Sequence, residues 1–130
     1  MAAPSMTLGT TLHTSATLAA SGTATDTFDA STKFEAQAMY KVTAAGTVGT
    51  PFGVRVDVFE IYSGSTYGNA STGTAVPNYS YTVAGYAASQ IVYSPKIFVS
   101  TGKWLFKLTN LDSANSVTVE GIIDTVDSVA

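Results

Sequence analysis

Apolar and polar residues alternate with a period of two along three stretches of this sequence, and that period limits the fold more than any other feature. Residues 52–62 carry Phe52, Val54, Val56 and Val58 at alternate positions, with Arg55 and Asp57 between them. Residues 33–42 set Phe34, Ala36, Ala38, Tyr40 and Val42 against Lys33, Glu35, Gln37 and Lys41. Residues 103–109 set Trp104, Phe106 and Leu108 against Lys103, Lys107 and Thr109. Side chains of a strand point alternately to its two faces, so each stretch predicts a strand with one buried and one wet face.

Further strands are expected at about residues 12–19, 25–29, 78–83, 89–99 and 117–125. Pro95 interrupts residues 89–99, which predicts an edge strand, a bulge or two short strands there. The connecting segments are rich in Gly, Pro, Asn and Ser, and no stretch has a sustained helical period. About eight strands in 130 residues predict an all-β fold, an antiparallel β-sandwich of jelly-roll type. An immunoglobulin-like sandwich is the alternative topology.

Charged residues make up only 12% of the chain, and their positions are uneven. None lies from Met1 to Thr25, and none lies between Glu60 and Lys96. The net charge is −3 and the six Lys and Arg residues are scattered, so nucleic acid is not an expected partner. The apolar runs are a few residues long, far short of the roughly 20 that a membrane-spanning helix needs.

The uneven charge predicts two parts of one domain: a neutral N-terminal arm with the first strand over residues 1–25, and the β-sandwich over residues 26–130. The arm would either become ordered on the sheet edge of a partner or form an ordinary first strand. The first residues lack the basic and apolar segments of a signal peptide. The chain has no cysteine. We therefore expect synthesis in a reducing cytoplasm without export.

The second neutral block contains six of the seven tyrosines, mixed with Ser, Thr, Gly and Asn. Rigid amphipathic rings among small polar residues are typical of contact surfaces. Tyr67, Tyr79, Tyr81 and Tyr86 are therefore the candidate contact residues. The alternative is that these tyrosines fill the core or simply lie along strands.

The sequence contains no motif for nucleophilic, zinc or phosphate chemistry. His13 is the only histidine, and no Gly-x-Ser-x-Gly motif is present, so we expect His13 to be structural. One histidine without cysteines does not complete a usual zinc site. The segment from Ala44 to Gly49 lacks the lysine of a phosphate-binding loop.

The carboxylates offer no better site. Asp26 with Asp29, and Asp124 with Asp127, are too sparse for a calcium loop and are interpreted as solvated strand ends. Asp57 and Glu60 have opposite parity in one strand, whereas a glycosidase needs two carboxylates facing each other. We therefore expect a protein that is not an enzyme and that uses no metal or cofactor.

Two segments resemble a known class of proteins. Residues 40–58, YKVTAAGTVGTPFGVRVDV, end one strand at VTAAG and lead through a Thr- and Pro-containing loop into alternating valines. Residues 102–112, GKWLFKLTNLD, are followed by NSVTV at 115–119 in a similar way. Both segments resemble small β-sandwich accessory proteins of tailed-bacteriophage virions. The resemblance implies a capsid decoration (cement) protein, or another accessory protein of the head, neck or tail, and it carries no catalytic residue.

The expected function is therefore that of a non-enzymatic structural protein of a phage virion, made in the host cytoplasm. Its expected partners are the major capsid protein or another virion protein, together with copies of itself in a homo-oligomer, for which a trimer is one candidate. The alternative is a carbohydrate- or receptor-binding β-sandwich module of a tail or head fibre. In that case Tyr67, Tyr79 and Tyr81 would stack on sugar rings.

Overall fold

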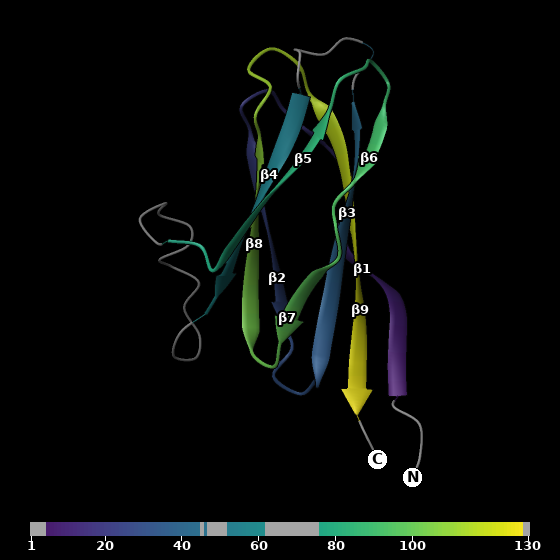
Figure 1. The fold of residues 1–130 in the computed structure, drawn as a ribbon, viewed down its shortest axis with the longest axis vertical. Coiled ribbons are helices and arrows are strands. Elements are labelled where there is room, and N and C mark those ends of the chain that lie inside the picture. Colours follow the sequence, from purple (N-terminus) through teal and green to yellow (C-terminus); the bar gives the residue numbers. More distant parts are fainter. Residues whose placement is uncertain (1–4, 45, 47–51, 62–75, 129–130) are drawn as a thin grey trace.

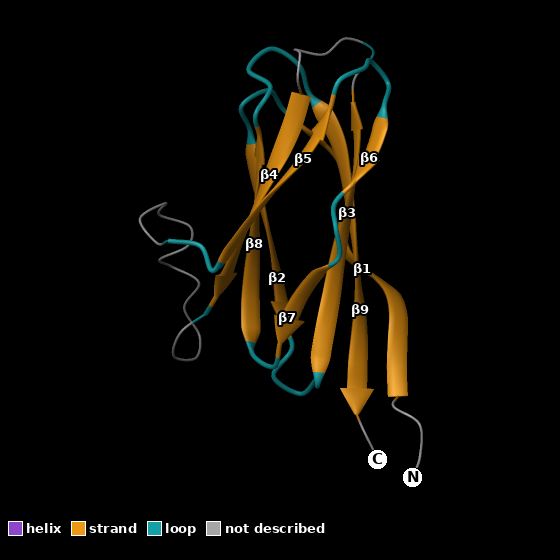
Figure 2. Ribbon diagram, viewed as in Figure 1, coloured by secondary structure: helices purple, strands orange, loops and turns teal. Residues whose placement is uncertain are grey.

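The computed structural model describes residues 5–44, 46, 52–61 and 76–128, and within these ranges every regular element is a β-strand (Figures 1 and 2). The strands are β1 (Ser5–Leu18), β2 (Thr23–Asp29), β3 (Glu35–Ala44), β4 (Phe52–Glu60), β5 (Tyr79–Gly85), β6 (Ile91–Tyr93), β7 (Ile97–Ser100), β8 (Lys103–Asn110) and β9 (Val117–Ser128). Among the described residues there is no helix of the length and apolarity needed to cross a membrane.

The strands form two antiparallel sheets that lie face to face (Figure 2). The five-stranded sheet has the order β1-β9-β3-β6, and β7 also pairs with β3; the four-stranded sheet has the order β2-β8-β4-β5. Since β6 and β7 pair with successive parts of β3, they are two halves of one interrupted strand. Counted so, the order is that of an eight-stranded jelly roll, which confirms the predicted fold class. The immunoglobulin-like alternative has a different strand order.

The interruption between β6 and β7 lies at Ser94 and Pro95. The Ser94 N–H donates to the Tyr40 carbonyl at 2.8 Å, and the Ser94 hydroxyl oxygen accepts the Tyr40 N–H at 2.9 Å. The serine side chain thus replaces a backbone partner next to a proline, which has no N–H to donate. Of the three options for residues 89–99, the structure has two short strands.

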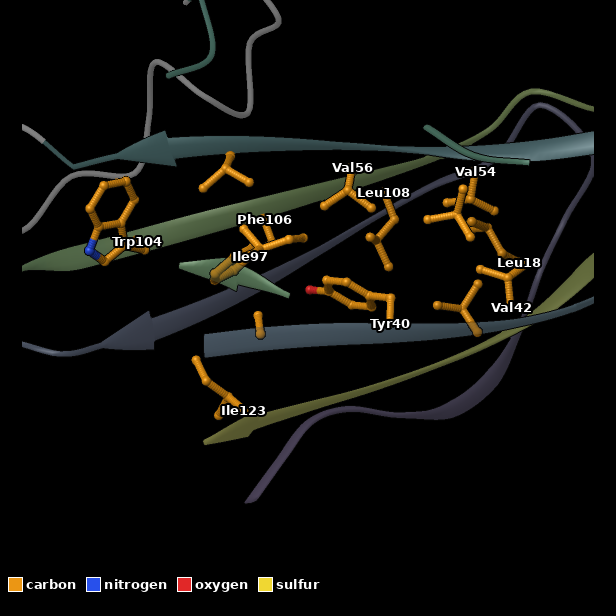
Figure 3. Packing of buried hydrophobic residues seen from close by; sticks show 14 of the residues in the cluster. Leu18, Tyr40, Val42, Val54, Val56, Ile97, Trp104, Phe106, Leu108 and Ile123 are labelled. Carbon is orange, nitrogen blue, oxygen red and sulfur yellow. The ribbon is translucent and has the colours of Figure 1, made fainter. Parts of the chain in front are cut away.

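The core lies between the inward faces of the two sheets. Tyr40 and Phe106, from opposite sheets, meet edge to face with ring centroids 6.2 Å apart (Figure 3). The predicted inward residues of β4 and β8 are buried: Val54, Val56, Val58, Trp104, Phe106 and Leu108. Alternation therefore gave the correct inward face for these two strands, and for β3 from Ala36 to Val42.

One predicted side-chain position and one predicted exposure are wrong. Phe34 is 64% exposed rather than inward, because β3 begins one residue later and Phe34 lies in a bend that does not follow the strand alternation. Asp57 lies on the outward face of β4, as parity predicts, yet it is only 8% exposed. Arg55 Nε donates to Asp57 Oδ2 at 3.0 Å, and the Ser80 hydroxyl donates to Asp57 Oδ1 at 2.7 Å. The predicted inward position of Phe52 concerns a side chain outside the described residues.

The strand β1 begins seven residues earlier than the expected strand at 12–19 and includes most of the neutral N-terminal segment. It pairs with β9 along its whole length and is an edge strand of the five-stranded sheet (Figure 1). Its register with β9 shifts four times, and Gly9 has a φ of 71° at one of these shifts. The Gly9 N–H donates to Asp124 Oδ1 at 2.6 Å. Such bulges twist an edge and reduce its tendency to pair with another chain.

Candidate functional site

The outward face of the five-stranded sheet carries several apolar side chains that are open to solvent. Met39 of β3 lies opposite Ile122 of β9 in the register of the sheet, and both are half-buried. The neighbouring strands β6 and β7 add Ile91, Tyr93 and Phe98, which are 49%, 61% and 55% exposed. These residues are adjacent because β6 and β7 both pair with β3. Apolar side chains gathered on one open face indicate a contact surface.

A shallow hollow of about 190 Å³ lies in the middle of this face. It is lined by Met39, Lys41, Tyr93, Glu120 and Ile122. Its volume is below the range of about 300–1,000 Å³ that is typical of pockets for small ligands. The hollow therefore fits a protruding side chain of a partner better than it fits a whole small molecule.

Two opposite charges lie side by side in the row next to the apolar centre of the face. Lys41 of β3 and Glu120 of β9 are directly paired in the sheet, one row away from Met39 and Ile122. Neither makes an ion pair with another residue in the part of the chain that the structure describes. We call the set Met39, Lys41, Ile91, Tyr93, Phe98, Glu120 and Ile122 the outer contact face.

The four tyrosines that the sequence analysis selected are not part of this face. Tyr79 and Tyr81 lie on β5, opposite the buried Val58 and Val56, so they point inward. Tyr79 stacks on Trp104 with ring centroids 6.3 Å apart and planes at 17°. Tyr81 is half-buried against the core. Both therefore follow the alternative interpretation that the tyrosines pack within the sandwich, although Tyr79 remains 45% exposed.

Tyr86 lies in the turn after β5 and is 69% exposed, and its N–H donates to Gln90 Oε1 at 2.8 Å. It is thus a single exposed ring in a turn. Tyr67 lies outside the described residues. The structure does not bring Tyr79, Tyr81 and Tyr86 together into one site.

The sequence analysis missed the outer contact face, although the sequence contains a signal for it. Met39 occupies a position of β3 that should be polar by the alternation of residues 33–42. Ile122 is likewise an apolar residue at an outward position of β9, between the charged residues Glu120 and Asp124. An apolar residue at an outward position of each strand would have indicated the face if the pairing of β3 with β9 had been known.

His13 belongs to a partly buried polar cluster between strands rather than to an open site. Its Nδ1 lies 2.8 Å from Asp26 Oδ1 and 2.9 Å from Asp26 Oδ2. The Tyr40 hydroxyl donates to Asp26 Oδ2 at 2.9 Å. Burial, and then the neighbouring charge of Asp26, raises the pKa of the Tyr40 hydroxyl far above its usual range. The Asp26 carboxylate is thus bound by His13 and Tyr40 within the fold, and this supports a structural role for His13.

The remaining acid pairs do not converge on a common point. Asp26 points inward and Asp29 outward, since they are three residues apart in one strand. Asp124 accepts the N–H of Gly9, whereas Asp127 accepts hydrogen bonds from the hydroxyls of Thr7 and Thr125 and pairs with Lys33. Within the described ranges no group of three or more His, Asp or Glu side chains is arranged as a metal site.

No family model matches this chain, and no curated protein matches it either. The similar solved structures include an exo-β-1,3-galactanase from Phanerochaete chrysosporium in complex with β-1,3-galactotriose, at 14% identity and a TM-score of 0.48. That match covers 94% of this chain but only 29% of the galactanase, so this chain spans less than a third of that protein's length.

Two further structures match over more of their own length. Xyl-CBM35 in complex with a disaccharide containing glucuronic acid has 15% identity and a TM-score of 0.44, over 86% of this chain and 75% of the module. The Yersinia pseudotuberculosis-derived mitogen has 12% identity and a TM-score of 0.45, and the match covers 98% of this chain and 90% of the mitogen. Structural neighbours of this chain thus include a carbohydrate-binding module. At these identities the matches show only a similar β-sandwich fold.

Proposed function

We propose that this chain is a non-enzymatic structural protein that works by contact, an accessory protein of a phage virion in the decoration or cement class. The observation that carries the proposal is the outer contact face, where Met39, Tyr93, Phe98 and Ile122 lie together on one side of a sheet. The partner is a protein of the virion, and copies of this chain are included among the candidates. The segments at 40–58 and 102–119 that resemble virion accessory proteins add to the support.

The size of the outer contact face is consistent with a protein partner. Ile91, Tyr93 and Phe98 are each about half exposed. Full burial of an exposed apolar side chain of this size contributes about 1.5–3 kcal/mol, so a partner that covers the remaining exposed half of each would gain about half of that free energy per side chain. The two charges at Lys41 and Glu120 would then fix the orientation of the partner rather than add much affinity.

The test uses virus particles assembled without this chain. Recombinant full-length protein should co-sediment with such particles, and Ile122→Lys should weaken the association because it places a charge at the centre of the face. Thr82→Lys, on the outward face of the four-stranded sheet, is the matched control and should bind as the wild type does. Absence of the protein from purified particles, together with no binding to particles that lack it, would reject the proposal.

A carbohydrate-binding module is the second candidate, and the exposed ring of Tyr93 favours it. Tyr93 offers an exposed ring next to a carboxylate and an ammonium group, and sugar faces pack on aromatic rings while their hydroxyls bind charged groups. The stacking residue would then be Tyr93 rather than Tyr79, which is already stacked on Trp104. In a glycan array, Tyr93→Ala should remove every hit that the wild type gives, whereas Tyr86→Ala should retain them. An array without hits excludes this candidate.

A further inference from the structure

The outer contact face is complementary to itself, and we infer that its occupant is a second copy of this chain, bound around a two-fold axis. The inference rests on the proposed function and names the partner of the face. It is carried by the register of β3 and β9, which fixes where each charged and apolar residue lies relative to the others.

Pairs of residues opposite each other in the sheet define rows across the face. Glu120 pairs with Lys41 in one row, and Ile122 pairs with Met39 in the next. In an isologous dimer the same patch faces itself, so that residue i contacts residue j and residue j contacts residue i. Consider a two-fold axis that lies in the interface, parallel to the strands and midway between β3 and β9. Rotation about this axis places β9 of one copy over β3 of the other, and each residue then faces the residue with which it is paired within its own sheet.

This placement brings opposite charges together and apolar residues together. Glu120 of one copy faces Lys41 of the other, twice by symmetry, and Ile122 faces Met39 in the same way. The next row places Asp124 over Gln37, an acceptor over an amide that can donate. Lys41 and Glu120, which make no ion pair among the described residues, thus each gain a partner, while the apolar centre is removed from water.

The edges of the face fit the same axis. The strand order β1-β9-β3-β6 means that β6 and β7 of one copy lie over β1 of the other. The exposed rings of Tyr93 and Phe98 would therefore cover β1, which has no Asp, Glu, Lys or Arg. A neutral strand is a surface on which aromatic rings pack without desolvating a charge.

The area is sufficient for a specific dimer. Five rows of side chains on four strands, with strands about 4.8 Å apart, form a face of about 650 Å² in projection. The two copies together would bury about 1,300 Å², which lies in the range of about 1,200–2,000 Å² for specific interfaces. Met39, Lys41, Glu120 and Ile122 lie at the centre of this face, next to the axis.

The test is sedimentation velocity of the full chain and of charge variants. The wild type should sediment as a species of twice 13.4 kDa. In Lys41→Glu two glutamates, and in Glu120→Lys two lysines, face each other across the axis, and this happens twice by symmetry. Each single variant should raise the dissociation constant about 100-fold or more. The double variant Lys41→Glu/Glu120→Lys should restore the dimer, and a mixture of the two single variants should form a heterodimer.

The mixture separates this arrangement from other ways of dimerising, because one variant then has acids at both positions and the other has lysines at both. Thr82→Glu, which adds a negative charge to the opposite sheet, is the control and should leave the dimer intact. Thermal unfolding of each variant checks that it is folded. A monomeric wild type at concentrations well above micromolar, a trimer, or a dimer that tolerates both single charge reversals would overturn the inference.

These outcomes are distinct from those that decide the proposed function. A monomeric chain that still binds virus particles would leave the proposed function in place and remove the two-fold dimer. A dimer that responds to the charge variants but binds no particle would do the reverse.

Discussion

The hydroxyl of Tyr40 donates a hydrogen bond of 2.9 Å to the carboxylate of Asp26, and this bond joins the two sheets of the sandwich. Tyr40 belongs to β3 of the five-stranded sheet, and Asp26 belongs to β2 at the edge of the four-stranded sheet. His13, on the edge strand β1, binds the same carboxylate. One carboxylate therefore connects three strands on the side of the sandwich where β1 and β2 are the edges.

Removing the Tyr40 hydroxyl should destabilise the protein without changing the packing of its ring. We expect Tyr40→Phe to lower the free energy of unfolding by about 1.5–3 kcal/mol, the range for hydrogen bonds to charged groups. Urea unfolding measures this value. Tyr86→Phe, in which the ring is 69% exposed, is the control and should change stability by less than about 0.5 kcal/mol. Equal stability of Tyr40→Phe and the wild type would show that the bond between the sheets contributes nothing.

Gly121 should be intolerant of a side chain because the Tyr40 ring occupies the space. A Cβ at this position would lie 2.7 Å from Tyr40 Cε1 and 2.9 Å from Cδ1. The ring is buried and its hydroxyl is held by Asp26, so it has little freedom to move. We expect Gly121→Ala to cost about 1–3 kcal/mol, as overpacking does in other cores. Thermal and urea unfolding measure the loss.

Gly46→Ala is the matched control for that substitution, since a Cβ at Gly46 would meet no atom within 4 Å. It should leave stability unchanged or raise it slightly, because alanine reduces the freedom of the unfolded chain. If both variants were equally stable, the close approach of Gly121 to Tyr40 would not be a constraint on the fold.

The strands were predictable from sequence because their information is local. In β4 and β8, valines, Trp104, Phe106 and Leu108 recur at every second position, and a period of two has one structural meaning. Phe34 shows where this reasoning ends. It continues the alternation in sequence, but the strand begins after it, and strand ends depend on turn geometry rather than on the period.

The outer contact face was not predictable in the same way because it depends on pairing between distant strands. Met39 and Ile122 are each a single apolar residue at an outward position, which is common on protein surfaces. They form a patch only because β3 pairs with β9 in the register that places them opposite each other. Conversely, Tyr79 and Tyr81 were candidate contact residues with a core position as the alternative, and only the pairing of β5 with β4 shows that they point inward.

Asn110 should be among the least replaceable polar residues. It is 1% exposed, and its Nδ2 lies 3.2, 3.1 and 2.9 Å from the carbonyl oxygens of Leu18, Ala19 and Asn115. In Asn110→Asp a carboxylate oxygen would face these carbonyl oxygens, so we expect a loss of about 3 kcal/mol or more in urea unfolding. Asn110→Ala removes the shared donor without adding a charge, and the Ala19 carbonyl keeps the N–H of Gly22, so this variant should lose less. A smaller loss for the aspartate variant than for the alanine variant would contradict this explanation.

Acid should weaken the attachment of β1 through Asp127. Hydrogen bonds from the hydroxyls of Thr125 and Thr7, with the ammonium group of Lys33, lower the pKa of Asp127 from 3.8 to about 2. The folded pKa lies below the unfolded one, so the unfolded chain binds more protons between these values. The stabilisation is therefore fully present above about pH 3.8 and is lost as the pH falls through about 2.

The comparison of wild type with Asp127→Asn isolates this contribution, because the two proteins differ only in this carboxyl group. We expect the wild type to be the more stable at pH 5, and we expect the difference in unfolding midpoint to shrink as the pH is lowered towards 2. Hydrogen exchange should place the effect in β1, since Thr7 lies on that strand and binds Asp127 at 2.6 Å. A difference that stays constant from pH 5 to pH 2 would mean that the Asp127 carboxylate does not hold β1 through its charge, and the backbone ladder and the bond from Gly9 to Asp124 would then hold the neutral edge strand to β9.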